Sequence, residues 1–588
     1  MNKIFLVFSL FLLLAGCGQG ATSVPTASPN ISPASTHTNV PISTPTKAMT
    51  PTSTPTSTTM PTSTPIEVGP VVGGPSGTEG HPWWNDAVFY EINVCSFYDS
   101  NGDGIGDFNG VTEKLDYLKD LGITGIWLMP IHPSFYFPGY AADDLYSVNP
   151  KYGTLQDFKR LLAEAHKRGI RVIIDRVVHD TSTQNPWFIS AQDPNSPYRQ
   201  WYIWSNYDQG RDQWGLQAWF KTPSGYYFSE FGSADGPTLD LKNPAVTAEE
   251  NKVSQFWLQD AGVDGFRIDN AGGLVPEGRT LNDTPSTHAW LKAFHDFYKS
   301  LNPEAFTVGE LWKEPASLMA TYTQGDQVDT VFEFNIAGAI LESVQSGNNA
   351  SINTALKQAV ALIPQLRFDP FITNHDMDRE MSVLKGNVGQ AKAAASLLLT
   401  SPGVPFIFFG EEIGMEGTIK NAAGLSWYWN QNLPMQWSGD KNGGFSANSP
   451  WMPVDSSYLS NNVSDELKDA NSLLSHYKIL ISVRNAHPAL RIGDLSIVTT
   501  SNPGLFASLR VASSETDLVL INLTDKSIST INLSLDKSSL NPGVYSASPI
   551  LSQEVSGDLN INARGGFNYI PVGEIPAYGT VIIQFNPK

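Results

Sequence analysis

Cysteine is scarce in this chain of 588 residues, which has two, Cys17 and Cys95. Cys17 ends an N-terminal leader; if its thiol is lipidated, as argued below, Cys95 is the only other thiol and no intramolecular disulfide is available. The body must therefore be stabilised by burial alone, and its length predicts several domains rather than one core. A membrane-spanning run is missing too, because the apolar run of the leader, residues 4–14, is too short to cross a bilayer.

Basic residues are in short supply as well. The chain has 37 Lys and Arg against 57 Asp and Glu, a formal net charge of −20. A surface of this sign repels phosphate backbones and anionic membranes, so no nucleic-acid partner is expected. The 15 Trp and 20 Tyr suit a neutral carbohydrate partner, since sugar C–H faces stack on aromatic rings, although aromatic side chains also fill ordinary cores.

The first 17 residues have the pattern of a secretion signal. Lys3 precedes the apolar run, which leads into Leu-Ala-Gly-Cys, a sequence that resembles the lipobox of bacterial lipoproteins. The resemblance implies cleavage before Cys17 and acylation of its thiol; the alternative is an ordinary signal peptide with an incidental cysteine. Residues 18–80 are rich in Thr, Ser and Pro, which predicts a disordered linker. We expect an extracytoplasmic protein, on the cell membrane or cell surface, whose only membrane contact is the lipid anchor.

From residue 81 onward, strand-like apolar runs alternate with amphipathic helical patterns. The helical patterns include residues 111–122 and 154–169, each of which ends in glycine. Eight such alternations predict an α/β fold with a parallel sheet, and eight strands close a (β/α)8 TIM barrel. The predicted strands are residues 88–94, 123–129, 171–178, 263–269, 306–311, 328–334, 369–375 and 405–410.

Two segments interrupt or end this alternation. After the third strand, about residues 181–245 are rich in Trp, Tyr, Gly and Asn, and a connection this long predicts a small inserted domain. After a helical pattern at 472–485, alternating Val, Ile, Leu and Thr with turn residues predict a C-terminal all-β sandwich domain over 491–588. The catalytic barrel is therefore expected over residues 81–490.

Three acidic residues each end a predicted strand or follow it directly: Asp269 in GFRID, Glu310 in FTVGE and Asp376 in FITNHD. They would lie at the C-terminal ends of strands four, five and seven, the face on which TIM barrels carry out catalysis. A retaining glycosidase needs one carboxylate as nucleophile and one carboxyl group as acid/base, and a third acid can hold the sugar hydroxyls. Arg267 lies on the same strand face as Asp269 and would keep that carboxylate ionised.

The ordered motifs of the body resemble those of the α-amylase family of glycoside hydrolases (family 13). They are GITGIWLMP, GYAADDLYSVNPKYGT, GIRVIIDRVV, GFRID, VGELW, FITNHD, GVPFIFFGEEIGM and PMQW, and the resemblance covers about residues 82–588. It implies the barrel, the insert and the β-sandwich. It also implies that Asp269 is the nucleophile, Glu310 the general acid/base and Asp376 the transition-state stabiliser. Substrate-binding roles follow in the same way for Tyr140, Arg267, His375 and Arg379.

Two positions depart from the family pattern. The family usually has Asn-His after strand three, where the Asn often helps to bind calcium and the His contacts the sugar; this chain has His179-Asp180. After the nucleophile, residues 270–273 lack the Lys-His pair of many α-amylases. Exo-acting relatives that split α-1,6 bonds commonly have Asp where this chain has Ala141 and Val where it has Asn270.

A loop after the first strand, residues 99–107, alternates oxygen-bearing and small side chains. Oxygen ligands at every second position suit Ca²⁺, although no bidentate Glu follows at the twelfth position as in an EF-hand. Several family members bind Ca²⁺ here. We therefore expect a structural Ca²⁺ site, with an Asp- and Gly-rich turn as the alternative; its ligands would be Asp99, Asn101, Asp103, Ile105 and Asp107.

These observations predict a lipid-anchored, retaining α-glucan hydrolase that cleaves α-1,4 bonds of starch-like oligo- or polysaccharides. The catalytic acids are shared with neopullulanases, cyclomaltodextrinases, α-glucosidases and 4-α-glucanotransferases, which remain alternatives. A non-catalytic glucan-binding protein on the same scaffold is a further alternative, although such relatives usually lack one or more of the three acids.

Overall fold

The computed structural model describes residues 77–588 except 136, 420–429 and 552–554. The leader with Cys17, and almost all of the 18–80 linker, lie outside the described residues. Within the described part, no helix combines the length and apolar character needed to cross a membrane.

Eight parallel strands form one sheet in the order β10-β9-β8-β7-β3-β2-β1-β11. The ends of this sheet meet, because Val404 N donates to Phe368 O (3.2 Å) and Phe406 N to Pro370 O (3.0 Å). The result is the TIM barrel that the sequence predicted. Its strands are β1 (Phe89–Ile92), β2 (Gly125–Leu128), β3 (Arg171–Arg176), β7 (Gly265–Ile268), β8 (Phe306–Gly309), β9 (Thr330–Phe332), β10 (Phe368–Asp369) and β11 (Phe406–Phe408).

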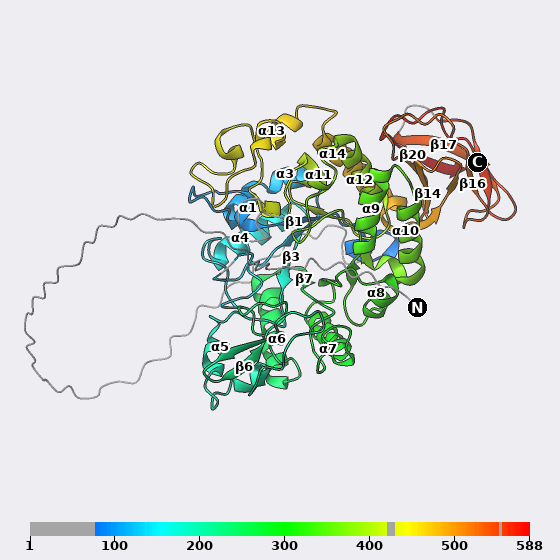
Figure 1. Cartoon of the computed structure of the whole chain (residues 1–588). Helices are drawn as coiled ribbons and strands as arrows, with labels where there is room; N and C mark the ends of the chain where they lie inside the picture. The colour runs from blue at the N-terminus through cyan, green and yellow to red at the C-terminus, as the bar shows by residue number, and fades with distance from the viewer. Residues whose placement is uncertain (1–76, 136, 420–429, 552–554) are drawn as a thin grey trace, which may run out of the picture. The chain divides into compact units, whose positions relative to one another are not determined.

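Helices surround these strands (Figure 1). The pattern at 154–169 forms α4, which Thr154 caps by accepting from Asp157 N, while the Asp157 carboxylate accepts from Thr154 N. The main helices are α2 (Phe108–Glu113), α3 (Leu115–Leu121), α4 (Leu155–Lys167), α6 (Pro244–Gln255), α7 (Pro285–Leu301), α8 (Ala316–Tyr322), α9 (Phe334–Ser346), α10 (Ala350–Leu362), α12 (Val388–Thr400) and α14 (Leu473–Ala486). Shorter ones are α1 (Val94–Phe97), α5 (Pro186–Ala191), α11 (Glu380–Val383), α13 (Val463–Glu466) and α15 (Pro488–Ile492).

The barrel interior is filled by aromatic side chains. Phe89 stacks on Phe406 with ring centroids 4.6 Å apart, and Trp127 lies 5.3 Å from Phe332. All four side chains are at most 3% exposed. Burial of each such side chain stabilises the fold by about 1.5–3 kcal/mol. This packed layer gives the strand ends above it a rigid base.

A small antiparallel sheet follows β3, as predicted for the insert. Its strands β4 (Trp204–Ser205), β5 (Trp219–Thr222) and β6 (Gly225–Phe228) run in the order β4-β6-β5. Phe188 of α5 packs against Tyr227 of β6 with ring centroids 4.9 Å apart, which joins helix and sheet into one unit. Two residues beyond β6 the chain reaches Glu230, which contacts the residue after Asp269.

The C-terminal part folds into two antiparallel sheets, as the sequence predicted. One has six strands in the order β12-β14-β15-β20-β17-β18, and the other has three in the order β13-β16-β19. A second core of mostly aliphatic side chains packs in this part of the chain. The strands are β12 (Asp494–Ile497), β13 (Thr499–Thr500), β14 (Leu505–Val511), β15 (Thr516–Asn522), β16 (Leu533–Leu535), β17 (Gly543–Leu551), β18 (Leu559–Ile561), β19 (Phe567–Tyr569) and β20 (Thr580–Pro587).

Candidate active site

The three acids predicted from the sequence follow three barrel strands. Asp269 directly follows β7 and Glu310 directly follows β8, while Asp376 lies in the loop after β10. Backbone hydrogen bonds hold the C-terminal ends of β7 and β8 together, since Glu310 N donates to Ile268 O (3.0 Å) and Ala271 N donates to Glu310 O (3.0 Å). The side chains of the three acids are 15%, 10% and 16% exposed. They are sheltered from bulk water but not fully buried.

The guanidinium of Arg267 joins two of these acids. It contacts Asp269 through one terminal nitrogen and Glu310 Oε2 through the other, at 2.7 Å for the latter. Asp175, the cross-strand neighbour of Arg267 on β3, accepts from the same guanidinium at 2.9 Å. Arg267 is 1% exposed, so its charge is neutralised by carboxylates rather than by water. Asp269 and Glu310 are thereby held at fixed positions beside each other.

Glu310 has the electrostatic environment of a general acid. Burial raises its pKa to about 7, the negative charges of Asp269 and Asp376 act in the same direction, and Arg267 opposes them. The backbone N–H of Asn270 donates to Glu310 Oε2 (3.1 Å), which fixes the orientation of the carboxyl group. A carboxyl group with a pKa near neutrality can carry a proton at the pH at which it must deliver it.

Asp376 is held in its ionised form by a histidine. Although burial opposes ionisation, His375 lowers the pKa of Asp376, and its Nε2 lies 3.2 Å from Asp376 Oδ2. Asp376 and Glu91 together raise the pKa of His375 well above its usual range, against the effect of burial. Tyr140 stacks on the His375 ring with centroids 5.6 Å apart, and its hydroxyl lies 2.7 Å from His375 Nε2. The structure therefore brings Tyr140, Arg267 and His375 together with the three acids.

Arg379, the remaining predicted substrate-binding residue, is turned away from this cluster. It is 1% exposed, and its guanidinium donates to Gln431 O and Phe409 O, both at 2.7 Å. These contacts tie the loop after β10 to the segment that follows β11. Arg379 thus supports the loop that carries Asp376, while its Nη2 has no hydrogen-bond partner among the described residues, so its predicted contact with substrate stays a prediction.

Two glutamates at the site were missed by the sequence analysis. Glu91 of β1 accepts from His375 Nδ1 at 2.6 Å, and Glu230 of the insert accepts from Asn270 Nδ2 at 3.0 Å. Asn270 has a positive φ of 44°, so Glu230 holds the residue after Asp269 in a left-handed conformation. Burial and the nearby Asp180 raise the pKa of Glu230 well above its usual range. The FYEI motif of β1 places an acid in a barrel strand, which is the signal that could have indicated Glu91.

The unusual pair His179-Asp180 lies on the insert side of the site. His179 is fully buried, and neither of its ring nitrogens has a hydrogen-bond partner; Nε2 lies 3.5 Å from Asp180 Oδ2. Asp180 Oδ1 and Glu230 Oε1 are buried oxygens that also have no hydrogen-bond partner. Asp180 pairs with Thr238 through an isolated β-bridge, so its position is fixed by the end of the insert.

The 99–107 loop is organised by its own oxygen atoms. Asp99 Oδ1 accepts from Gly102 N (2.7 Å), Asn101 Oδ1 from Asp103 N (2.8 Å), and Asp103 Oδ1 from Ile105 N (2.9 Å). Asp107 caps α2 by accepting from Gly110 N (2.8 Å). The side-chain oxygens of this loop therefore accept from its own backbone N–H groups, and its three carboxylates are not among the described groups whose ligand atoms lie within 4.8 Å of one another. Oxygen atoms of this kind are the ligands that a hard cation such as Ca²⁺ prefers.

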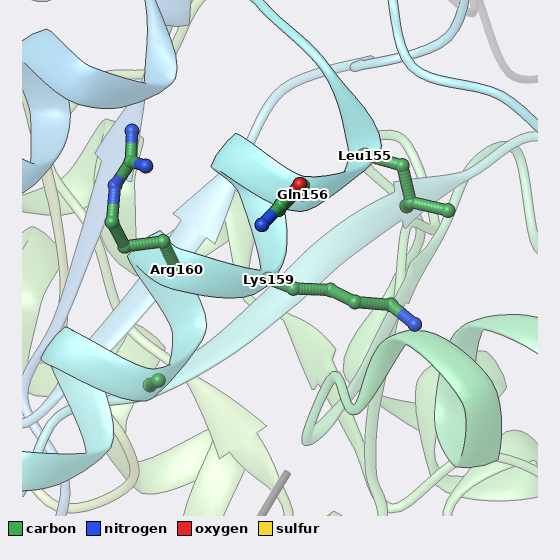
Figure 2. A pocket seen from close by; sticks show the side chains of 5 residues that line it. Leu155, Gln156, Lys159 and Arg160 are labelled. Carbon is green, nitrogen blue, oxygen red and sulfur yellow. The ribbon is translucent and has the colours of Figure 1, made fainter. Parts of the chain in front are cut away.

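An open hollow elsewhere on the molecule does not compete with this site. Figure 2 shows side chains of α4 that line it. It contains no carboxylate and none of the residues described above; its lining residues are Leu155, Gln156, Lys159, Arg160 and Ala163.

Comparison with known proteins agrees with this geometry. The catalytic-domain model of the alpha-amylase family matches residues 91–493. "Alpha-amylase 3" of Dictyoglomus thermophilum is 36% identical over 449 residues, which cover 75% of this chain and 85% of that protein. "Oligo-1,6-glucosidase" of Parageobacillus thermoglucosidasius is 32% identical over 514 residues, which cover 76% of this chain and 91% of that protein.

A solved structure gives the same result. The crystal structure of an alpha-amylase from H. orenii superposes with a TM-score of 0.73 at 32% identity, covering 85% of this chain and 99% of that one. Residues 91–493, which the family model matches, include the barrel segments that carry Asp269, Glu310 and Asp376. The chain therefore belongs to the alpha-amylase family and is a glycoside hydrolase of that family.

Proposed function

We propose that this protein hydrolyses α-1,4-glucosidic bonds of starch-like glucans with retention of anomeric configuration. The observation that carries the proposal is the guanidinium of Arg267, which contacts Asp269 and Glu310 at once. Two carboxyl groups on one guanidinium lie close together, as double displacement requires; in retaining enzymes their separation is about 5–5.5 Å, against roughly 6.5–9.5 Å in inverting ones.

The geometry supports a definite order of steps. Asp269 attacks the anomeric carbon, the bond to the leaving glucan breaks, and Glu310 transfers its proton to the departing oxygen. Water then attacks the glycosyl-enzyme intermediate while Glu310, now ionised, takes up a proton from it, and Asp269 leaves. The raised pKa of Glu310, about 7, suits a group that must both give and take a proton.

Asp376 and His375 are assigned to the sugar that reacts. The ionised Asp376 can accept hydrogen bonds from hydroxyl groups that become more acidic as the ring approaches an oxocarbenium ion. His375, charged between Asp376 and Glu91, keeps Asp376 ionised and oriented toward that sugar, and Tyr140 offers an aromatic face beside it. We assign substrate contacts to Asp376 and Tyr140, and a supporting role to His375 and Arg379.

The choice of α-1,4 bonds depends on residues around the site and on the relatives. Ala141 and Asn270 differ from the Asp and Val that exo-acting α-1,6 enzymes commonly have at these positions. The relatives nevertheless include proteins named alpha-amylase, oligo-1,6-glucosidase and trehalose synthase/amylase. Product analysis on starch, pullulan, cyclodextrin and isomaltose tests the proposal, with Asp269→Asn as the inactive control. Rapid size reduction of starch with isomaltose left intact is the expected result, and release of glucose from isomaltose alone would contradict it.

We also propose that the 99–107 loop binds a structural Ca²⁺ ion through Asp99, Asn101, Asp103, the Ile105 carbonyl and Asp107. Three carboxylates in one short loop repel each other less when a cation lies among them. The ion would stabilise the native state only, by about 2.7 kcal/mol at a hundredfold excess over Kd. Ca²⁺ added to the EDTA-treated protein should raise the melting temperature of the wild type but not that of Asp103→Ala. Identical wild-type melting in EDTA and in excess Ca²⁺ would reduce the loop to a turn.

The same proposal includes a lipid anchor. The lipobox-like sequence before Cys17 and the Pro-rich linker after it support extracytoplasmic attachment of the enzyme to the cell membrane. Metabolic labelling with a fatty acid should mark the wild-type protein and leave Cys17→Ser unlabelled. An unlabelled wild type would contradict the anchor without affecting the catalytic assignment.

A further inference from the structure

Three side chains of ligand type meet where the last helices of the barrel join the C-terminal sheet. His487 lies between α14 and α15, Glu515 immediately precedes β15, and Asp517 lies within that strand. One nitrogen or carboxylate oxygen of each lies within 4.8 Å of the corresponding atoms of the other two. None of these residues takes part in the catalytic cluster or in the 99–107 loop.

Of the three residues, Asp517 lacks the hydrogen-bond partners that a buried carboxylate normally has. It is fully buried, yet neither of its carboxylate oxygens has a hydrogen-bond partner. Arg510 is its cross-strand neighbour on β14, but the Arg510 guanidinium donates to Thr400 O (2.6 Å) and Gly493 O (2.9 Å) instead. A buried carboxylate without hydrogen bonds is costly, and a protonated one would still need an acceptor for its O–H. Asp517 therefore calls for a partner that the neighbouring side chains do not supply.

Glu515 and His487 are oriented beside it. His487 Nδ1 lies 2.7 Å from Glu515 Oε1, which also accepts from Gln584 Nε2 at 2.6 Å. Glu515 Oε2 accepts from Ala489 N at 3.1 Å, so the first turn of α15 holds the carboxylate in place. The side chains of His487 and Glu515 are 21% and 8% exposed, which leaves the group open to solvent on the histidine side. An ion could enter from that side and reach Asp517.

We propose that His487, Glu515 and Asp517 bind a divalent transition-metal ion of the zinc class, with water completing the coordination. Ca²⁺ and Mg²⁺ prefer ligand sets made of oxygen alone, whereas an imidazole with two carboxylates suits Zn²⁺ and its neighbours in the first transition row. Zinc lies about 2.0–2.2 Å from such ligands. The ion would take the place of the hydrogen-bonded proton between His487 Nδ1 and Glu515 Oε1, so that Nδ1 coordinates the ion while the ring proton resides on Nε2, and the contact between the two side chains would widen.

The ion would have a structural consequence. His487 belongs to the helical segment that ends the barrel, while Glu515 and Asp517 belong to the first long hairpin of the C-terminal sheet. A shared ion links these two parts of the chain, and the described residues contain a single free thiol, Cys95, that could not form an internal disulfide. The ion should leave the catalytic groups unchanged, since none of its ligands contacts them.

Metal titration of the full-length chain, purified in detergent and freed of metal with a chelator, tests this inference. Co²⁺ is the probe, because its visible absorption reports imidazole and carboxylate ligands, and Zn²⁺ should displace it. We expect one equivalent to bind to the wild type, and affinity to fall at least tenfold in His487→Gln and in Asp517→Asn. His295→Gln and Asp525→Asn, which change the same residue types elsewhere, should bind as the wild type does.

Two controls distinguish loss of the metal site from misfolding and from metal binding at the 99–107 loop. His487 is partly exposed, so His487→Gln should fold even if a change at the buried Asp517 does not, and far-ultraviolet circular dichroism checks this. Asp103→Ala should retain the Co²⁺ spectrum, which separates the site from the 99–107 loop. Zn²⁺ should raise the melting temperature of the wild type but not that of folded His487→Gln. Absence of Co²⁺ binding by the wild type, or unchanged affinity in folded His487→Gln, would overturn the proposal.

Discussion

The two sides of the active site differ in how completely their polar atoms are paired. On the barrel side, Arg267 joins Asp175, Asp269 and Glu310, and His375 joins Glu91 and Asp376. On the insert side, buried atoms of His179, Asp180 and Glu230 have no hydrogen-bond partner. On the barrel side every carboxylate has a charged partner, although Arg267 Nε has no acceptor, whereas on the insert side buried carboxylate oxygens have no protein donor within the described part of the chain.

This difference separates two tasks. Charge pairing keeps catalytic groups in position and in the right protonation state before substrate arrives, which reduces reorganisation during the reaction. Unpaired acceptors contribute little to that order; of these groups Asp180, whose side chain is 13% exposed, is the one most open to a sugar hydroxyl, since His179 and Glu230 are almost fully buried. We therefore expect changes on the barrel side to lower kcat and changes on the insert side to act mainly on KM.

We expect the largest effect from removing the carboxyl groups of Asp269 and Glu310, which Arg267 holds in position. Asp269→Asn and Glu310→Gln should each lower kcat by at least ~10³-fold, because one removes the proposed nucleophile and the other the proposed proton donor. Steady-state hydrolysis of a soluble maltooligosaccharide by the purified variants measures the loss. Turnover near the wild-type level in either variant would remove the proposed mechanism.

These two residues could be identified from the sequence because each directly follows an apolar strand, and a TIM barrel brings such strand ends to one face. Glu91 could not be identified as a partner of His375, since 284 residues separate them and only closure of the barrel brings β1 beside the loop after β10. Glu230 was hidden for another reason. It belongs to an insert without regular periodicity, and its contact with Asn270 depends on how that insert returns to the barrel.

The fold class followed from eight alternations of strand and helix, and the C-terminal sheets followed from alternating apolar residues. The group at His487, Glu515 and Asp517 gave no such signal, because its members come from a helix junction and a sheet and share no spacing typical of a motif.

The next effect is a dependence of kcat/KM on pH that reports the proton on Glu310. Since burial raises the pKa of Glu310 to about 7, the protonated form predominates below pH 7 and is lost above it. We expect kcat/KM to fall about tenfold per pH unit above 7, by roughly a hundredfold at pH 9. A substrate with an activated aryl leaving group needs less protonation and should show a weaker decline. A profile that stays flat from pH 6 to 9 would contradict the assignment of Glu310 as the acid.

A smaller effect should follow from removing the charge of Glu91, which contacts His375 rather than the substrate. In Glu91→Gln, His375 loses one of the two anions that raise its pKa, so its charged form and its orientation beside Asp376 are weakened. Loss of a charge-assisted hydrogen bond of about 1.5–3 kcal/mol corresponds to a roughly ten- to hundredfold lower kcat.

The KM of Glu91→Gln should change much less than its kcat. The pH above which activity is lost should be lower than in the wild type, because His375 loses its charge more readily without Glu91. Glu277→Gln, which changes an exposed glutamate that bonds Ser286, should leave both constants unchanged. Equal rises of KM in Glu91→Gln and in a variant of the insert side would show that the two sides do not differ as proposed.

The smallest effect is expected on the insert side, at Asp180. Its Oδ1 is a buried acceptor without a protein partner, and burial raises the pKa of the carboxyl group. Asp180→Asn keeps the shape but replaces an acceptor by a donor at one of the two positions. A lost hydrogen bond to a sugar hydroxyl, at about 0.5–1.5 kcal/mol, should raise KM by roughly two- to tenfold while kcat stays within about threefold of the wild type.

Initial rates over a range of maltooligosaccharide concentrations measure both constants, with Asp193→Asn, an exposed position of the same insert, as the control. A fall in kcat comparable to that of Glu91→Gln would place Asp180 within the charge network and remove the distinction between the two sides.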